Sequence, residues 1–89
     1  MKNVIIDGTM INSISDVHRI FAETLDFPSW YGNNLDALHD CLTDVCEETL
    51  VTVRNRRELG EAVGARMNGL MNVLESSVFE NRNISLLVE

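Results

Sequence analysis

A short apolar run near the middle of the chain indicates the fold, and it reads Leu50-Val51-Thr52-Val53. β-branched residues fill three of its four positions, and the run is short, so it predicts a buried strand. Two similar runs lie near the ends of the chain, at residues 2–7 and 84–88. We predict that these three segments are the strands of one sheet.

The segments between the predicted strands have helical spacing. Apolar residues recur every three or four positions over residues 15–25, 35–45 and 66–80, and a weaker helical pattern follows residue 57. A parallel neighbour is reached through a crossover helix and cannot be reached by a tight turn. The sequence therefore predicts one α/β domain, residues 1–89, with a small three-stranded parallel β-sheet packed by three to four helices.

Composition narrows the class of protein. The chain has 89 residues, of which 45% are hydrophobic and 24% charged, as in an ordinary soluble globule. The amino terminus lacks the apolar stretch of a signal peptide, and no apolar run reaches the length of a membrane helix, so we expect a cytoplasmic protein without membrane contact. Cys41 and Cys46 are too few for a disulfide framework, and we expect free thiols that pack as small hydrophobes.

Charge is distributed unevenly along the chain. All seven Lys and Arg residues lie outside residues 20–53, and seven acids in those flanking regions balance them. The whole net charge of −7 therefore comes from the seven acids within residues 20–53. The acids of the segment are Glu23, Asp26, Asp36, Asp40, Asp44, Glu47 and Glu48. A field of one sign attracts a cationic partner and repels nucleic acid, although an acidic surface that serves only solubility gives the same pattern.

The predicted helix that starts after the cap residue Asn34 carries most of this charge. At about 100° per residue, one arc of its surface collects a polar set, and the apolar stripe fills a neighbouring arc. The polar set is Asp36, His39, Asp40, Thr43 and Glu47, with Asp44 beside it. No basic residue lies three or four positions away to relieve the repulsion between the acids. This pattern fits partner binding, and it also fits a charged face that is merely solvated.

Other chemistry is less well supported. Asp36, His39 and Asp40 could offer three ligands to a divalent metal, but no second cluster completes the site. The chain has no phosphate-binding Gly-rich loop and no G-x-S-x-G motif, so we predict neither an enzyme nor a cofactor. The basic run at residues 54–57 is too small for a nucleic-acid track, and we expect it to pair with Glu58 and Glu61.

Four aromatic or histidine positions carry separate expectations. Trp30 and Tyr31 lie in a short loop after Pro28, and the sequence leaves open whether they belong to the core or anchor an interface. His18 is expected on or near the surface of its helix. Phe79 is grouped with the inward apolar positions of the helix over residues 66–80.

One motif resembles a known family. The motif reads Tyr31-Gly32-x-Asn34-Leu35-Asp36-Ala37-Leu38-x-Asp40-Cys41-Leu42-Thr43. It is similar to the barstar family of intracellular ribonuclease inhibitors, and a looser similarity extends over the whole chain. The resemblance implies a small parallel sheet packed by helices, and it implies that the second helix and its preceding loop plug a ribonuclease active site.

The resemblance also assigns roles to residues. It implies that Asp40 enters the ribonuclease pocket that holds the substrate phosphate, and that Asp36 pairs with a second basic group. The surrounding contacts would come from Trp30, Tyr31, Gly32, Asn34, Leu35, Thr43 and Asp44. Trp30 replaces the tyrosine of the family at that position.

Three positions depart from the family pattern. His39 and Val45 stand where the family's inhibitor has tryptophan, and Ser76 occupies the approximate place of an interface glutamate, for which Glu75 and Glu80 compensate in part. We expect the partner to be a basic bacterial, barnase-like ribonuclease that prefers guanyl sites. The alternative is an immunity or interaction module of the same fold with a different partner.

Overall fold

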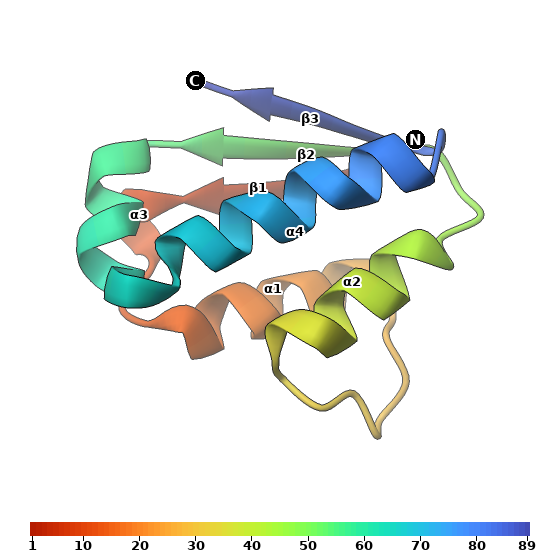
Figure 1. Ribbon diagram of the computed structural model, residues 1–89, viewed down its shortest axis with the longest axis horizontal. Coiled ribbons are helices and arrows are strands. Elements are labelled where there is room, and N and C mark those ends of the chain that lie inside the picture. The colour runs from red at the N-terminus through yellow and green to blue at the C-terminus, as the bar shows by residue number, and fades with distance from the viewer.

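The computed structural model describes residues 1–89, and it contains the predicted sheet (Figure 1). The strands are β1 (Lys2–Asp7), β2 (Thr49–Arg54) and β3 (Ile84–Val88), in the order β1-β2-β3. Both pairs are parallel, and Val4 lies opposite Val51 on β2, which lies opposite Leu86 on β3. The prediction of a three-stranded parallel sheet is confirmed.

Four α-helices and two short 3₁₀ segments connect the strands. The 3₁₀ segments are η1 (Gly8–Met10) and η2 (Gly64–Arg66). The helices are α1 (Ile14–Leu25), α2 (Leu35–Thr43), α3 (Arg56–Val63) and α4 (Met67–Glu80). Each parallel connection therefore contains helices, as the distance between parallel strand ends requires.

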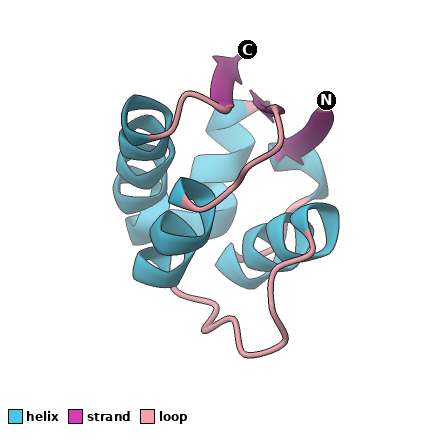
Figure 2. Cartoon of the chain, turned by 90° about the vertical axis from the view of Figure 1, so that its right-hand side faces the viewer, coloured by secondary structure: helices cyan, strands magenta, loops and turns pink.

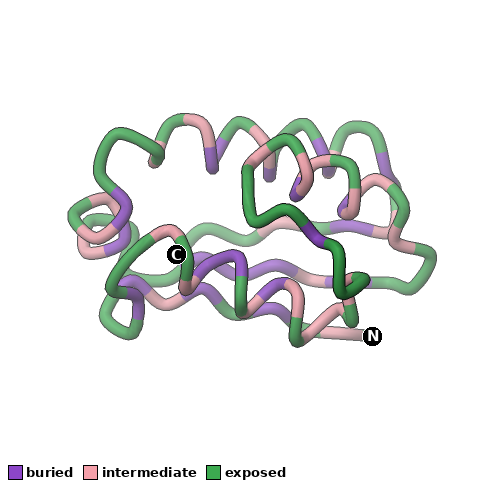
Figure 3. The backbone as a smooth tube through the Cα atoms, turned by 90° about the horizontal axis from the view of Figure 1, so that it is seen from below, coloured by how far each residue is buried: buried purple, intermediate pink, exposed green.

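One face of the sheet is covered and the other is open. On β1, Val4 and Ile6 are fully buried, whereas Asn3 and Ile5 between them face solvent. This alternation places successive side chains on opposite faces. Figure 2 shows α1, α2 and α4 on the same side of the sheet, and in Figure 3 the buried positions of α4 lie on the side of that helix that faces the rest of the chain.

A single core fills the space between the sheet and the helices. Sixteen buried apolar residues form it, including Phe21 of α1, Leu70 of α4 and the pair Leu38 and Leu42 of α2. Burial of a leucine side chain contributes about 2 kcal/mol, so these two leucines fix the inward face of α2. The opposite face of α2 is consequently held toward solvent.

A glycine allows α2 and α4 to approach closely. A Cβ atom added at Gly69 of α4 would lie 2.8 Å from Cδ1 of Leu35 at the start of α2. That separation is shorter than a carbon contact permits, so a larger residue would push the helices apart. The packing that orients α2 thus depends on this small residue.

Two expectations about burial and one about a helix end were wrong. His18 is 2% exposed and belongs to the interior, because α1 turns it toward the loop that follows the helix. Phe79 is 91% exposed, and Ser77 takes the inward position near the end of α4. The predicted helix over residues 35–45 ends at Thr43, so Val45 and Glu47 lie beyond it and do not share its faces.

Candidate functional site

The loop between α1 and α2 is anchored from inside the protein. Tyr31 is buried, and its hydroxyl lies 2.6 Å from Nδ1 of His18 on α1. The Tyr31 ring also packs at 5.0 Å from the ring of Phe27. Trp30, next to Tyr31, is 80% exposed. The structure therefore resolves the open question for both residues: Tyr31 is core, and Trp30 is free to contact a partner.

Folding stability is expected to fall as the pH drops below about 6.5, because burial and the nearby Arg66 lower the pKa of His18. Below that pH the unfolded chain binds a proton at His18 more readily than the folded chain does. The contribution of neutral His18 to stability is therefore complete above the pKa of the unfolded chain and is lost as the pH falls below it. Urea unfolding at about pH 7.5 and about pH 5.5 measures the change. Asp7 and Asp16 have lowered pKa values and lose their contributions only near or below 3.8, outside this window.

His18→Phe is the control for that measurement. Phenylalanine retains the buried ring and cannot titrate, so the variant should lose less stability on acidification than the parent protein does. An equal loss in both proteins would show that His18 is not the group responsible.

Three carboxylates form a ridge along the outer side of α2. Asp36, Asp40 and Asp44 follow at intervals of four residues, and Asp44 continues the helical turn as the C-cap, with φ −92° and ψ −5°. All three are exposed, and the side chain of Asp40 is 84% accessible. None pairs with Lys or Arg, because every ion pair that a Lys or Arg side chain forms is with a different acid. We call these residues the acidic ridge.

The amino end of α2 is fixed by a side-chain cap. Oδ1 of Asn34 accepts a hydrogen bond of 2.8 Å from the backbone N–H of Ala37, as the sequence predicted. Asn34 also donates to the carbonyl of Gly32 at 3.4 Å. The cap and the buried Tyr31 together hold the loop at a fixed angle to the acidic ridge.

A hollow of about 380 Å³ separates the loop from the acidic ridge. Its lining includes Trp30 and Gly32 from the loop and Asp40, Thr43 and Asp44 from the end of α2. The hydroxyl of Thr43 donates to the backbone carbonyl of Asp40 at 3.0 Å. The hollow therefore combines an exposed aromatic ring with two carboxylates that pair with no Lys or Arg, an arrangement suited to a cationic side chain.

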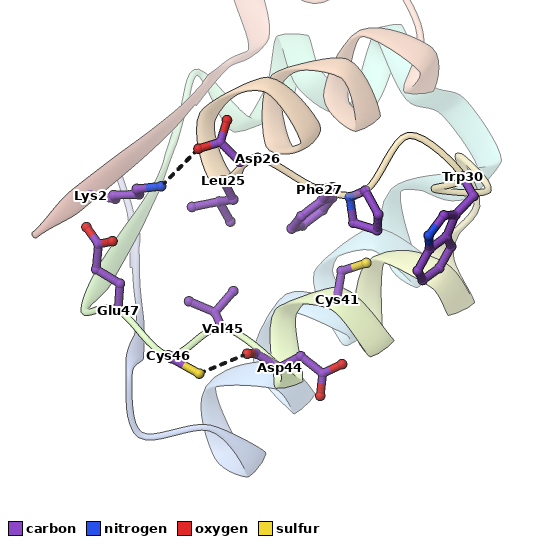
Figure 4. A pocket seen from close by; sticks show the side chains of 11 residues that line it. Lys2, Leu25, Asp26, Phe27, Trp30, Cys41, Asp44, Val45, Cys46 and Glu47 are labelled. Carbon is purple, nitrogen blue, oxygen red and sulfur yellow. Dashed lines mark hydrogen bonds and ion pairs between the residues drawn. The ribbon is translucent and has the colours of Figure 1, made fainter.

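A second hollow of about 430 Å³ lies beside the first (Figure 4). Figure 4 shows Leu25, Phe27 and Val45 around it, with Trp30 at its edge. Lys2 at its rim pairs with Asp26 at 3.6 Å.

A hydrogen bond links α2 to α4 at the side of the acidic ridge. Nε2 of His39 lies 2.5 Å from a carboxylate oxygen of Glu80, and Nδ1 of His39 is 3.9 Å from the Asp40 carboxylate. Ser76 is exposed one turn before Glu80. The end of α4 is therefore continuous with the surface of α2.

Asn81 holds the carboxyl end of α2. Its buried side-chain amide donates to the carbonyls of Leu42 and Val45, each at 2.9 Å, and lies 3.3 Å from the carbonyl of Thr43. The last carbonyls of a helix have no partner within the helix. Asn81 supplies that partner from the end of α4, and it thereby fixes where α2 stops.

Comparisons with known proteins place the chain in a family. A family model described as Barstar (barnase inhibitor) matches residues 1–89, the whole chain. The chain belongs to the barstar family. A relative in Bacillus subtilis (strain 168), named "Putative ribonuclease inhibitor YrdF", is 35% identical over 78 residues, which cover 86% of this chain and 86% of that protein.

In this barstar-family structure most of the predicted site residues are accessible on the loop, on α2 and just after it, and at the end of α4. The exposed or half-exposed members are Trp30, Gly32, Asn34, Leu35, Asp36, His39, Asp40, Thr43, Asp44, Val45, Ser76 and Glu80. Tyr31 is the exception, because it is buried and its hydroxyl is engaged by His18. Tyr31 therefore positions the loop.

The cysteines are free thiols, as predicted, and Cys41 packs against the core as expected of a small hydrophobe, whereas Cys46 does not. Cys41 is half-buried and Cys46 is exposed. Burial and the carboxylates of Asp44 and Asp40 raise the pKa of Cys41, so its thiol stays protonated at neutral pH. A protonated thiol is a poor nucleophile.

The basic run at residues 54–57 does not pair as expected. Nε of Arg54 donates to Glu89 at 2.9 Å, across β2 and the carboxyl terminus. Arg56 and Arg57 form no ion pair with Glu58 or Glu61, since their side chains leave the first turn of α3 toward solvent.

The structure assembles no group of three His, Cys, Asp or Glu side chains that could hold a metal ion. Nε2 of His39 lies against a carboxylate oxygen of Glu80 on α4. No helix has both the length and the apolar character needed to cross a membrane.

Sequence reasoning missed two residues that position the candidate site in this barstar-family protein. Asn81 appeared only as the end of a helix, and His18 as a surface residue. Both act through contacts with residues at least thirteen positions away. Their one sequence signal is polarity at positions where helical spacing points inward, as it does for His18 next to Val17 and Phe21.

Proposed function

We propose that this protein inhibits a basic bacterial ribonuclease by placing the acidic ridge and the Trp30–Asn34 loop over its active site. The observation that carries the proposal is the unpaired acidic ridge on a rigidly held helix. Three like charges that no Lys or Arg compensates reduce stability, and they gain interaction energy when a cationic surface covers them. Family membership supports the same function.

In this mechanism Asp40 takes the place of the substrate phosphate. A ribonuclease binds phosphate with Arg, Lys and His groups, and a carboxylate can accept charge-assisted hydrogen bonds from the same groups. Asp40 stands at the middle of the acidic ridge and lines the hollow beside the loop. Asp36 and Asp44, one turn to each side, would pair with neighbouring cations.

The remaining contacts surround this centre. Gly32, Asn34 and Leu35 would contact the partner from the loop and the first turn of α2. Thr43 and Val45 would extend the contact at the other end of α2.

Glu80 and Ser76, one turn apart on α4, would form the edge of the interface, and Glu80 is the residue that contacts His39. Trp30 would supply an aromatic anchor, since it is already exposed in the free protein. Exposed aromatic side chains of this kind dominate many interfaces.

We propose a barnase-like, guanyl-preferring ribonuclease as the partner. Inhibition of a ribonuclease that the same cell makes requires the inhibitor in the cytoplasm, before the enzyme leaves. Net charges of opposite sign would also raise the rate of association at low salt.

The test is titration of a basic bacterial ribonuclease with this protein while RNA cleavage is measured. We expect inhibition that is complete at one equivalent and weakens as salt rises. The double variant Asp36→Ala/Asp40→Ala should not inhibit. A panel of such ribonucleases that all remain active at excess inhibitor would contradict the proposal.

The replaced anchors favour one alternative. His39 and Val45 stand where the family's inhibitor has tryptophan, so the partner surface can differ from that of a barnase-like enzyme. An interaction module of this kind would bind its partner tightly through the acidic ridge without protecting RNA.

A further inference from the structure

Phe79 is the most exposed of the large apolar side chains, at 91%. It lies on the outer side of α4, whereas Leu70, Met71 and Leu74 lie on the buried side of the same helix. An aromatic ring gains nothing in free energy from full contact with water, and aromatic residues are enriched in interfaces. The position of Phe79 is therefore unexplained by the packing of the isolated chain.

Acidic groups surround the ring. Phe79 shares a shallow hollow of about 440 Å³ with Glu75, Ser76 and Glu80. Glu75 forms no ion pair, and the only partner of Glu80 is His39. No Lys or Arg of the chain neutralises this hollow, so its charge is complementary to a cation.

The hollow continues the surface proposed for the ribonuclease. The hydrogen bond between His39 and Glu80 connects it to the acidic ridge, because Asp40 is the next residue after His39. Figure 1 shows α2 and α4 side by side on the covered side of the sheet. A partner that covers the acidic ridge would thus reach the end of α4.

We propose that Glu75, Phe79 and Glu80 form a second contact site for the same basic partner, and that the Phe79 ring receives an arginine or lysine side chain. This inference rests on the proposed function. A cation over an aromatic face is attracted by the ring quadrupole, and flanking carboxylates add hydrogen bonds to the same group. A single ring between acids offers little area for a purely apolar partner surface.

The dissociation constant of the ribonuclease complex tests the site. Phe79→Ala and Phe79→Leu should each raise it by about threefold to thirtyfold, whereas Phe79→Trp should leave it similar or lower it. Leucine preserves apolar area and removes the π face, so it separates a cation from an apolar contact. Thermal unfolding of all three variants should match the parent protein, since the ring packs against little.

Met10→Ala is the matched control. Met10 is 75% exposed on η1, away from α2 and α4, and its loss should not change affinity. Glu75→Gln should weaken binding in the parent protein and have a smaller effect when Phe79 is already alanine, because both act on one cation.

The possible failures are distinguishable. If Asp40→Ala abolishes inhibition while Phe79→Leu binds as tightly as the parent protein, the second contact site is wrong and the proposed function stands. If the parent protein binds no basic ribonuclease, both are wrong. If sedimentation shows a dimer that Phe79→Ala converts to a monomer, the ring contacts a second copy of the chain, and the assignment to the ribonuclease is overturned.

Discussion

Asp40→Ala is expected to weaken the complex with the ribonuclease by about a hundredfold or more. The side chain is 84% accessible and its one ion-pair partner is His39, at 3.9 Å, so the free protein loses little when it is removed. In the complex it would be withdrawn from water against several cationic donors. Its removal leaves those donors buried and unpaired, which costs more than the contact itself. Inhibition assays at fixed salt give the change in the inhibition constant.

Glu61→Ala is the control for Asp40→Ala. Glu61 is exposed on α3, so its removal changes the net charge by the same amount far from the acidic ridge. We expect its effect on the inhibition constant to stay within about threefold, as for other distant surface charges. Equal losses from the two variants would mean that net charge, and not the position of Asp40, governs binding.

Asn81→Asp is expected to destabilise the fold by about 3 kcal/mol or more at neutral pH. The change preserves the shape of the side chain and replaces its donor with a charged acceptor. The introduced carboxylate would face the carbonyls of Leu42 and Val45, where Asn81 now donates at 2.9 Å to each. With a total stability of about 5–15 kcal/mol for a small domain, urea unfolding measures such a loss easily.

Two comparisons sharpen this test. The repulsion raises the folded-state pKa of the introduced carboxyl, so the deficit of Asn81→Asp should shrink as the pH falls and the group binds a proton. Asn72→Asp makes the same chemical change at an exposed position of α4 and should leave stability nearly unchanged. A deficit that is independent of pH would contradict the capping role.

The strands and most helices were predictable because their signals are local. β-branched runs mark the strands, helical spacing marks α1, α2 and α4, and the Asn34 cap marks the start of α2. Each signal depends on residues within a few positions of one another. The predicted end of α2 was wrong, because Val45 continues the apolar spacing of the helix, whereas α2 ends at Thr43 and Asn81 caps the Leu42 carbonyl.

The candidate site was partly predictable for the same reason. The acidic ridge follows from the spacing of Asp36 and Asp40 on one helix, and its lack of basic neighbours follows from the sequence alone. The sequence did not show that Trp30 is exposed and Tyr31 is buried, because the side chains of adjacent loop residues have no fixed inward direction. His18 on α1 decides it by holding the Tyr31 hydroxyl.

The sequence by itself determined the strand and helix order, the family and the excess of negative charge on α2, because all three depend on residue type and short spacing. Tertiary structure decided which side chains meet across the chain. It buried His18, left Phe79 in solvent and connected His39 to Glu80, 41 residues away. Such contacts depend on how α1, α2 and α4 pack over one face of the sheet, and no local pattern specifies that packing.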